Sequence, residues 1–124
     1  MTREKIRTSD APQPAGNYSQ GIRLGNLVWT AGFGPQDPVT GAIASSVADQ
    51  TRQVLRNVAA TLAAADLTLD DVVKTTVHLA DLADFAEFNE AYGEFFGDPK
   101  PARTTVGSVL AGIKVEIDVV AGRV

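Results

Sequence analysis

Two ionisable side chains in the C-terminal part of the chain are of types that suit hydrolytic chemistry on a small acid. Arg103 lies in the run Pro-Ala-Arg-Thr-Thr-Val, and Glu116 lies in a later run of alternating apolar and polar residues. A guanidinium donates two parallel hydrogen bonds to a carboxylate, whereas a glutamate takes a proton from water and orients it. On this pattern alone, most arginines are exposed at the surface and most glutamates in half-buried strands face solvent. A structural role and a role in chemistry therefore stay open for both Arg103 and Glu116.

Three further polar side chains are candidates for ligand contact. Tyr18 lies where a loop meets a strand, and Asn89 interrupts the aromatic stripe of a helix, so each suits either a ligand or local packing. His78 is interpreted as structural, because the sequence supplies no partner for it in a metal site. No phosphate-binding glycine motif and no Gly-x-Ser-x-Gly elbow occurs in the chain.

Composition excludes several classes of protein. The 124 residues are 44% hydrophobic, which predicts one domain over residues 1–124. The absence of cysteine excludes disulfides and thiolate chemistry, and we expect neither a metal nor a cofactor. The net charge of -4 argues against nucleic-acid and membrane-surface partners. The N-terminus has no secretory pattern and no apolar run could span a bilayer, so a cytoplasmic protein is expected.

Hydrophobic periodicity predicts three N-terminal strands followed by alternating helices and strands. The expected strands cover residues 5–8, 19–24, 27–32, 72–79, 103–109 and 114–124, and the helices cover 47–65 and 84–96. Gly25 and Asn26 predict a hairpin turn, and Asp84 with Glu87 resembles a capping box. The result is an α+β fold in which two helices cover one face of a mixed sheet.

The residue pattern of the last strand predicts that the face of the sheet away from the helices carries ionisable side chains. Val115, Ile117 and Val119 share one side, which leaves Glu116 and Asp118 on the other. Two helices cover only one face, so the opposite face is expected to meet solvent or a second subunit around a wet cavity.

Several segments together resemble the RidA family, also known as the YjgF family, over nearly the whole chain. They are residues 16–20 (Gly-Asn-Tyr-Ser-Gln), 30–32 (Thr-Ala-Gly), 35–41 (Pro-Gln-Asp-Pro-Val-Thr-Gly), 50–57 (Gln-Thr-Arg-Gln-Val-Leu-Arg-Asn), 71–77 (Asp-Val-Val-Lys-Thr-Thr-Val), 88–96 (Phe-Asn-Glu-Ala-Tyr-Gly-Glu-Phe-Phe), 101–106 (Pro-Ala-Arg-Thr-Thr-Val) and 115–117 (Val-Glu-Ile). The resemblance implies a chorismate-mutase-like α+β fold that forms homotrimers with ligand clefts between subunits.

The resemblance also implies an activity, the hydrolysis of reactive 2-imino or enamine acids to 2-keto acids and ammonia without a cofactor. In this family pattern Arg103 clamps the substrate carboxylate, Glu116 orients the hydrolytic water, and Tyr18 and Asn89 line the cleft. The alternative within the family is a non-catalytic module that binds a small carboxylate such as a 2-keto acid. A ribonuclease or translation inhibitor fits less well, because the chain is acidic and lacks a histidine pair. Chorismate mutation would rest on the fold alone.

Departures from the family pattern cluster at the expected cleft. Ala31 and Phe33 replace a serine and a glutamine, and Thr105 replaces a cysteine common among the deaminases. The connection before Glu116 is shorter than usual and lacks a Leu-Pro pair, and Asp66 stands where a helix-ending glycine is common. Ala31, Phe33 and Thr105 are therefore expected to contact the substrate and to set which acid is admitted.

Overall fold

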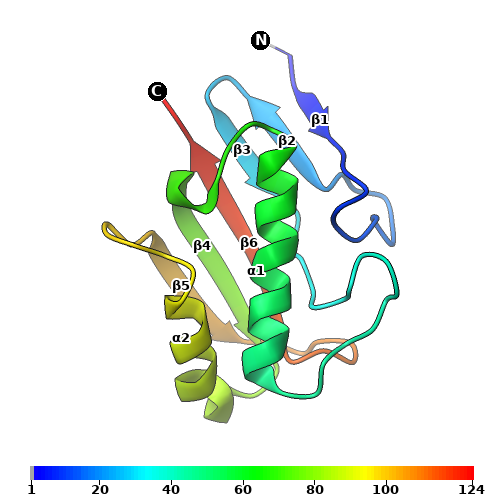
Figure 1. The fold of residues 1–124 in the computed structure, drawn as a ribbon, viewed down its shortest axis with the longest axis vertical. Helices are drawn as coiled ribbons and strands as arrows, with labels where there is room; N and C mark the ends of the chain where they lie inside the picture. The colour runs from blue at the N-terminus through cyan, green and yellow to red at the C-terminus, as the bar shows by residue number, and fades with distance from the viewer. Residues whose placement is uncertain (1) are drawn as a thin grey trace.

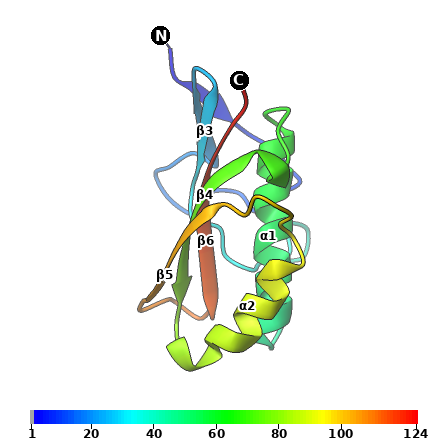
Figure 2. The ribbon, with the colours of Figure 1, turned by 90° about the vertical axis from the view of Figure 1, so that its left-hand side faces the viewer.

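A computed structural model describes residues 2–124, and these form one twisted sheet with two helices against one of its faces (Figures 1 and 2). The strands, the helices and the short 3-10 turns (η) run in the order β1 (Glu4–Ile6), β2 (Gly21–Leu24), β3 (Leu27–Thr30), α1 (Val47–Ala63), η1 (Leu69–Asp71), β4 (Val72–Leu79), η2 (Leu82–Asp84), α2 (Phe85–Gly93), β5 (Ala102–Gly107) and β6 (Val115–Gly122). The predicted order of elements and the α+β class with one mixed sheet are confirmed.

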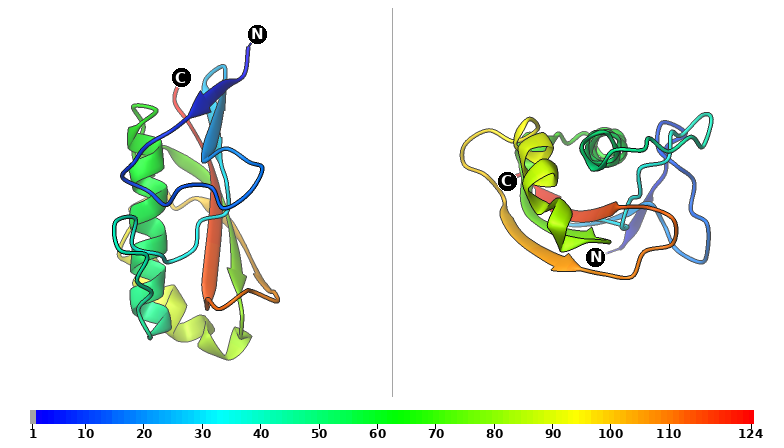
Figure 3. Two further views of the ribbon diagram at one scale, coloured as in Figure 1. Left: turned by 90° about the vertical axis from the view of Figure 1, so that its right-hand side faces the viewer. Right: turned by 90° about the horizontal axis from the view of Figure 1, so that it is seen from below.

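The sheet has the strand order β1-β2-β3-β6-β4-β5. Strands β4 and β5 are parallel, and every other neighbouring pair is antiparallel. A parallel pair needs a crossover connection, which α2 supplies between β4 and β5. Strand β5 is therefore an edge strand beside α2, and Figure 3 shows this edge in the view from below.

The alternation predicted for the last strand is confirmed. Side chains of β6 at Val115, Ile117, Val119 and Ala121 are at most 1% exposed and pack beneath the helices. Helix α1 presents its apolar stripe to the same core, with Val54, Leu55, Val58 and Leu62 fully buried. The hydrophobic core thus lies entirely between the sheet and the helices.

Helix α1 begins and ends with local signals in the sequence. The Ser46 hydroxyl accepts a hydrogen bond from the Asp49 amide at 3.1 Å, which caps the first turn. After the helix, Asp66 has a positive φ of 60°, the left-handed conformation that glycine adopts most readily. The buried Asn57 amide donates to the carbonyls of Gly34 and Gln36 at 3.0 and 2.9 Å, so the helix also fixes the segment after β3.

The predicted capping box of the second helix is wrong. Asp84 precedes α2 but makes no side-chain capping bond, because as the last residue of η2 its ψ of 3° is not the extended conformation that such a cap requires. Glu87 instead accepts a hydrogen bond from the Ala48 amide at 3.0 Å, at the first turn of α1. The side chain expected to close a local motif therefore links the two helices.

Candidate functional site

Arg103 and Glu116, the two residues expected to act together, lie on opposite faces of the sheet. Arg103 is aligned with Thr75 of β4, which is fully buried beneath the helices. Glu116 is aligned with His78, which is three residues from Thr75 and so points to the other face. The described chain therefore carries two separate groups of candidate residues.

The Arg103 group lies between β5 and α2. The Arg103 Nη1 donates a hydrogen bond to Asn89 Oδ1 at 2.8 Å, so the structure brings these two predicted residues together. They share an open cavity of about 390 Å³ with Tyr92 and Lys100. Within residues 2–124, Arg103 forms no salt bridge, which leaves the rest of its donor fork available to an anion.

Thr105 lies two residues beyond Arg103 on the same edge strand. Alternation along β5 places both side chains on the same face, and Thr105 is aligned with the buried Val77. Its hydroxyl oxygen is buried, and no hydrogen-bond partner for it exists within residues 2–124. An unpaired buried hydroxyl costs free energy, so position 105 carries donor and acceptor capacity that the single chain does not use.

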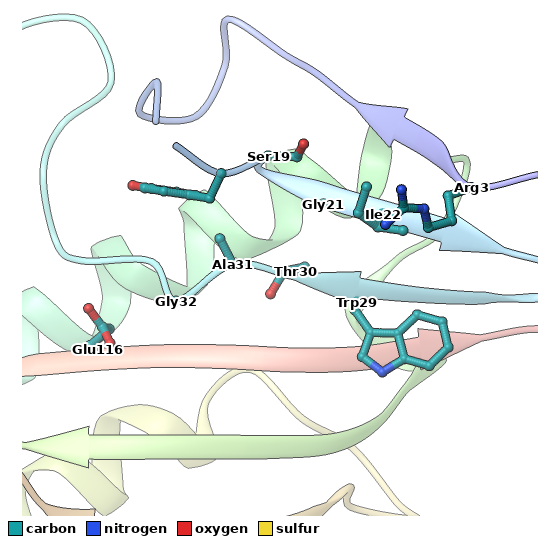
Figure 4. Close-up of a pocket in the computed structure, with 10 residues that line it drawn as sticks. Arg3, Ser19, Gly21, Ile22, Trp29, Thr30, Ala31, Gly32 and Glu116 are labelled. Carbon is teal, nitrogen blue, oxygen red and sulfur yellow. The ribbon is translucent and has the colours of Figure 1, made fainter. Parts of the chain in front are cut away.

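The Glu116 group lines a larger open cavity of about 700 Å³ on the outer face of the sheet (Figure 4). Tyr18, Ala31, Gly32 and Glu116 line it, together with Trp29. Figure 4 shows the glutamate beside Gly32, next to the strand end that carries Ala31. The structure therefore joins Tyr18, Ala31 and Glu116 in one cavity and leaves Arg103, Asn89 and Thr105 outside its lining.

Tyr18 is held at this cavity by an irregular loop. Its side chain is 52% exposed, and its hydroxyl accepts a hydrogen bond from the Ala15 amide at 3.2 Å. The loop depends on the buried amide of Gln20, which accepts from the Thr8 amide at 2.8 Å and donates to the carbonyls of Thr8 and Pro12 at 3.0 and 2.9 Å. Gln20 is a residue that the sequence reasoning missed as a determinant of the site.

Phe33 does not line either cavity, which corrects the expectation for this residue. Its backbone N–H and C=O pair with Ile117 at 2.9 and 3.1 Å, and its ring is only 5% exposed within the core. The chain leaves β3 after Thr30 and bridges to β6 again at Phe33, which turns the ring inward. The Phe33 ring therefore packs within the core and adds no apolar wall to either cavity.

Charged groups gather on the outer face beside Glu116. Burial raises the pKa of the Asp118 carboxyl, and the charges of His78 and Lys74 oppose this shift. His78 Nδ1 lies 2.7 Å from Ser108 Oγ, which holds the imidazole at the end of β4. The ionisable outer face predicted from the sequence is confirmed.

The aromatic side chains around Arg103 form a second feature that sequence reasoning missed. The guanidinium carbon lies 4.8 Å from the ring centroid of Tyr92, 5.4 Å from that of Phe85 and 5.7 Å from that of Phe88. Burial raises the pKa of the Tyr92 phenol, whose oxygen lies 2.8 Å from Thr75 Oγ1. The spacing of Phe85, Asn89 and Tyr92 by four and three residues placed them on one helical face and was the available signal.

Residues 2–124 contain neither a metal-binding cluster nor a membrane-spanning helix. No group of three or more acidic or histidine side chains is arranged to hold a metal ion there. Over the same residues, no helix is long and apolar enough to cross a membrane.

The fold and the site define an α+β protein with an arginine that forms no salt bridge within residues 2–124 on one face of a mixed sheet and a cavity-lining glutamate on the other. The profile of the Endoribonuclease L-PSP family matches residues 8–122. The chain belongs to this family, which includes the RidA and YjgF proteins.

Two curated relatives match along nearly their whole lengths. A RutC family protein of Pyrococcus horikoshii is 48% identical over 122 residues, which are 96% of this chain and 97% of the relative. The 2-iminobutanoate/2-iminopropanoate deaminase of Salmonella typhimurium is 45% identical over 123 residues, which are 95% of this chain and 96% of the relative.

Solved structures match equally well. The crystal structure of Escherichia coli TdcF with bound serine has a TM-score of 0.93 at 40% identity and covers 98% of this chain and 99% of that one. The YjgF gene product of Escherichia coli has a TM-score of 0.92 at 42% identity and covers 97% and 98% of the two chains.

Proposed function

We propose that the protein hydrolyses small reactive 2-imino acids, and their enamine tautomers, to 2-keto acids and ammonia. The observation that carries the proposal is the pair of half-sites, in which an arginine without a salt bridge on one face complements a glutamate-lined cavity on the other. Family membership supports the same chemistry, because relatives at 43–45% identity are named 2-iminobutanoate/2-iminopropanoate deaminases.

The proposed site forms between two copies of the chain. Because Arg103 and Glu116 leave the sheet on opposite faces, one copy cannot direct both at one small ligand. A second copy that lays its β5 edge against the outer face would bring its Arg103, Asn89 and Thr105 to the cavity of Tyr18 and Glu116. Large apolar side chains exposed on that outer face support such packing: Leu27 (40% exposed), Trp29 (40%) and Val106 (38%). A closed homotrimer is the proposed assembly.

The proposed mechanism needs only orientation and one proton acceptor. Arg103 binds the carboxylate of the imino acid, which aims the electrophilic C2 carbon at a water held by Glu116. Glu116 takes a proton from this water while the water oxygen forms a bond to C2. Proton transfer to the nitrogen and cleavage of the C2–N bond then release ammonia and leave the carbonyl of the 2-keto acid. The Thr105 hydroxyl and the backbone at Ala31 and Gly32 are the proposed contacts at the reacting end.

The direct test measures the decay of an imine. Threonine dehydratase generates 2-iminobutanoate from threonine, and semicarbazide traps the imine that remains. We expect the protein to reduce the trapped fraction, and Arg103→Ala and Glu116→Gln to abolish this effect while the protein stays folded. Unchanged imine decay with the wild-type protein would overturn the proposal.

A non-catalytic carboxylate-binding module is the second candidate function. Ala31 in place of a serine removes a hydroxyl from the cavity of Glu116, and a related structure, that of TdcF, contains bound serine. Thermal unfolding with 2-oxobutanoate separates the two functions. A raised melting temperature without faster imine decay would favour the binding module, since a ligand stabilises the state that it binds.

A further inference from the structure

We propose that Phe85, with Tyr92, is a positioning residue that orients the Arg103 guanidinium for the substrate carboxylate. This inference rests on the proposed function and assigns the aromatic face of α2 a part in it. Phe85, Asn89 and Tyr92 lie at successive spacings of four and three residues, so they form one face of the helix, directed at β5.

The geometry is that of a cation held over aromatic rings. The Arg103 guanidinium carbon lies within 6 Å of the ring centroids of both Phe85 and Tyr92, the range in which the face of a ring attracts a cation. The Tyr92 hydroxyl lies 2.8 Å from Thr75 Oγ1, so its ring is anchored on the neighbouring strand β4. One end of this aromatic support is therefore fixed to the sheet.

The supporting groups do not compete with a ligand. In residues 2–124, Arg103 contacts aromatic rings and an amide oxygen but no carboxylate, so its charge is not neutralised there. An arginine on an edge strand would otherwise lose much side-chain freedom on binding a carboxylate. Rings that hold the guanidinium plane before binding reduce this cost and keep the planar fork in one orientation.

Among the aromatic residues near Arg103, Phe85 is the one whose substitution best separates positioning of the guanidinium from packing of the core. Phe88 is fully buried and serves the core, whereas Phe85 is 38% exposed at the first turn of α2. The Phe85 ring also packs against that of Phe88, with 6.2 Å between the centroids, but at so exposed a position an aliphatic side chain can serve the same packing. A leucine at position 85 would keep most of the apolar contact with the core and remove the interaction of the ring face with Arg103.

The test compares Phe85→Leu with Phe85→Tyr, which keeps the ring, and with Phe95→Leu, the same change at a nearby ring that does not contact the guanidinium. We expect Phe85→Leu to weaken 2-oxobutanoate binding in calorimetry by about 3- to 5-fold and to raise KM for imine hydrolysis more than it lowers kcat. Phe85→Tyr should restore wild-type affinity, and Phe95→Leu should not change it.

A spectroscopic measurement separates positioning from folding. The NMR order parameter of the Arg103 Nε–Hε group should fall in Phe85→Leu, while backbone order in β5 stays the same. Unchanged affinity and unchanged Arg103 order in Phe85→Leu would overturn the inference, provided that Arg103→Ala still abolishes hydrolysis. If Arg103→Ala itself leaves hydrolysis intact, the proposed function fails first, so the two failures are distinguishable.

Discussion

The Glu116 carboxylate lies directly against the backbone of Gly32. A Cβ atom on Gly32 would lie 2.9 Å from Glu116 Oε2 and 3.0 Å from its Cδ, closer than such atoms approach one another. The nearest atoms belong to the end of a flexible side chain, so the carboxylate and not the backbone would move. Because Gly32 has no side chain, the Glu116 carboxylate has room to occupy its position.

Gly32→Ala should therefore reduce activity with little change in stability. We expect imine hydrolysis to fall about 10- to 100-fold, because a displaced proton acceptor no longer meets the water in line with C2. The free energy of unfolding should change by less than about 1 kcal/mol, because the φ of Gly32 lies outside the left-handed region. Gly97→Ala, whose Cβ would meet no atom within 4 Å, is the matched control for urea unfolding and activity. An active Gly32→Ala variant would contradict the role given to Glu116.

A site shared between copies predicts that two inactive variants rescue one another. After Arg103→Ala and Glu116→Gln are unfolded together in equal amounts and refolded, about a quarter of the interfaces should combine an intact arginine with an intact glutamate. About that fraction of wild-type activity should return in the imine assay. Mixing Arg103→Ala with the double variant should restore none. No recovery from a mixture whose subunits have exchanged would contradict a site that Arg103 and Glu116 share between copies.

The hydrogen bond between Thr75 and Tyr92 should show strong coupling in stability. Both side chains are buried, so Tyr92→Phe or Thr75→Val alone leaves one hydroxyl without its partner and should cost about 1–3 kcal/mol. The double variant should be less destabilised than the sum of the two, because it leaves neither hydroxyl unpaired. Urea unfolding of the four proteins measures the coupling, and additive losses would contradict a direct bond.

Asp71 should make stability depend on acid pH. A hydrogen bond from Arg123, and one from the Thr68 amide, lower the pKa of the Asp71 carboxyl below its ordinary value of 3.8. Since the folded state favours the ionised form, its stabilising effect is complete above the unfolded pKa and is lost as the pH falls through the folded pKa. Asp71→Asn should thus destabilise the protein near neutral pH and lose this deficit as the pH falls through the folded pKa of the Asp71 carboxyl.

The control for this prediction is the neighbouring Asp70→Asn, because the Asp70 carboxylate forms no ion pair within residues 2–124. Urea unfolding of the three proteins across the acid range gives the comparison. A constant deficit of Asp71→Asn at every pH would show that the carboxylate acts through shape and not through charge.

How far the sequence predicts this structure depends on whether a feature is local. The faces of β6 follow from a period-two pattern and the bounds of β4 follow from a run of β-branched residues, and both predictions agree with the structure. The inward direction of the Phe33 ring is not set locally, because it depends on the pairing of Phe33 with Ile117 of β6. Gly32 and Gly34 flank Phe33, so the sequence shows no hydrophobic periodicity there. Likewise, the strand pairing that sets Arg103 and Glu116 on opposite faces appears only in the assembled sheet.

The buried amide of Gln20 gives the loop that carries Tyr18 an unusual freedom to change. The Gln20 side chain bonds to the backbone of Thr8 and Pro12 and not to their side chains, and Gln13 adds a hydrogen bond to the Thr8 carbonyl. Exposed loop positions such as Ser9 and Asn17 can therefore accept new residues while position 20 keeps a primary amide, whereas Ala11 is buried in the core. Directed evolution of substrate range can begin at these exposed loop positions, which take no part in the core.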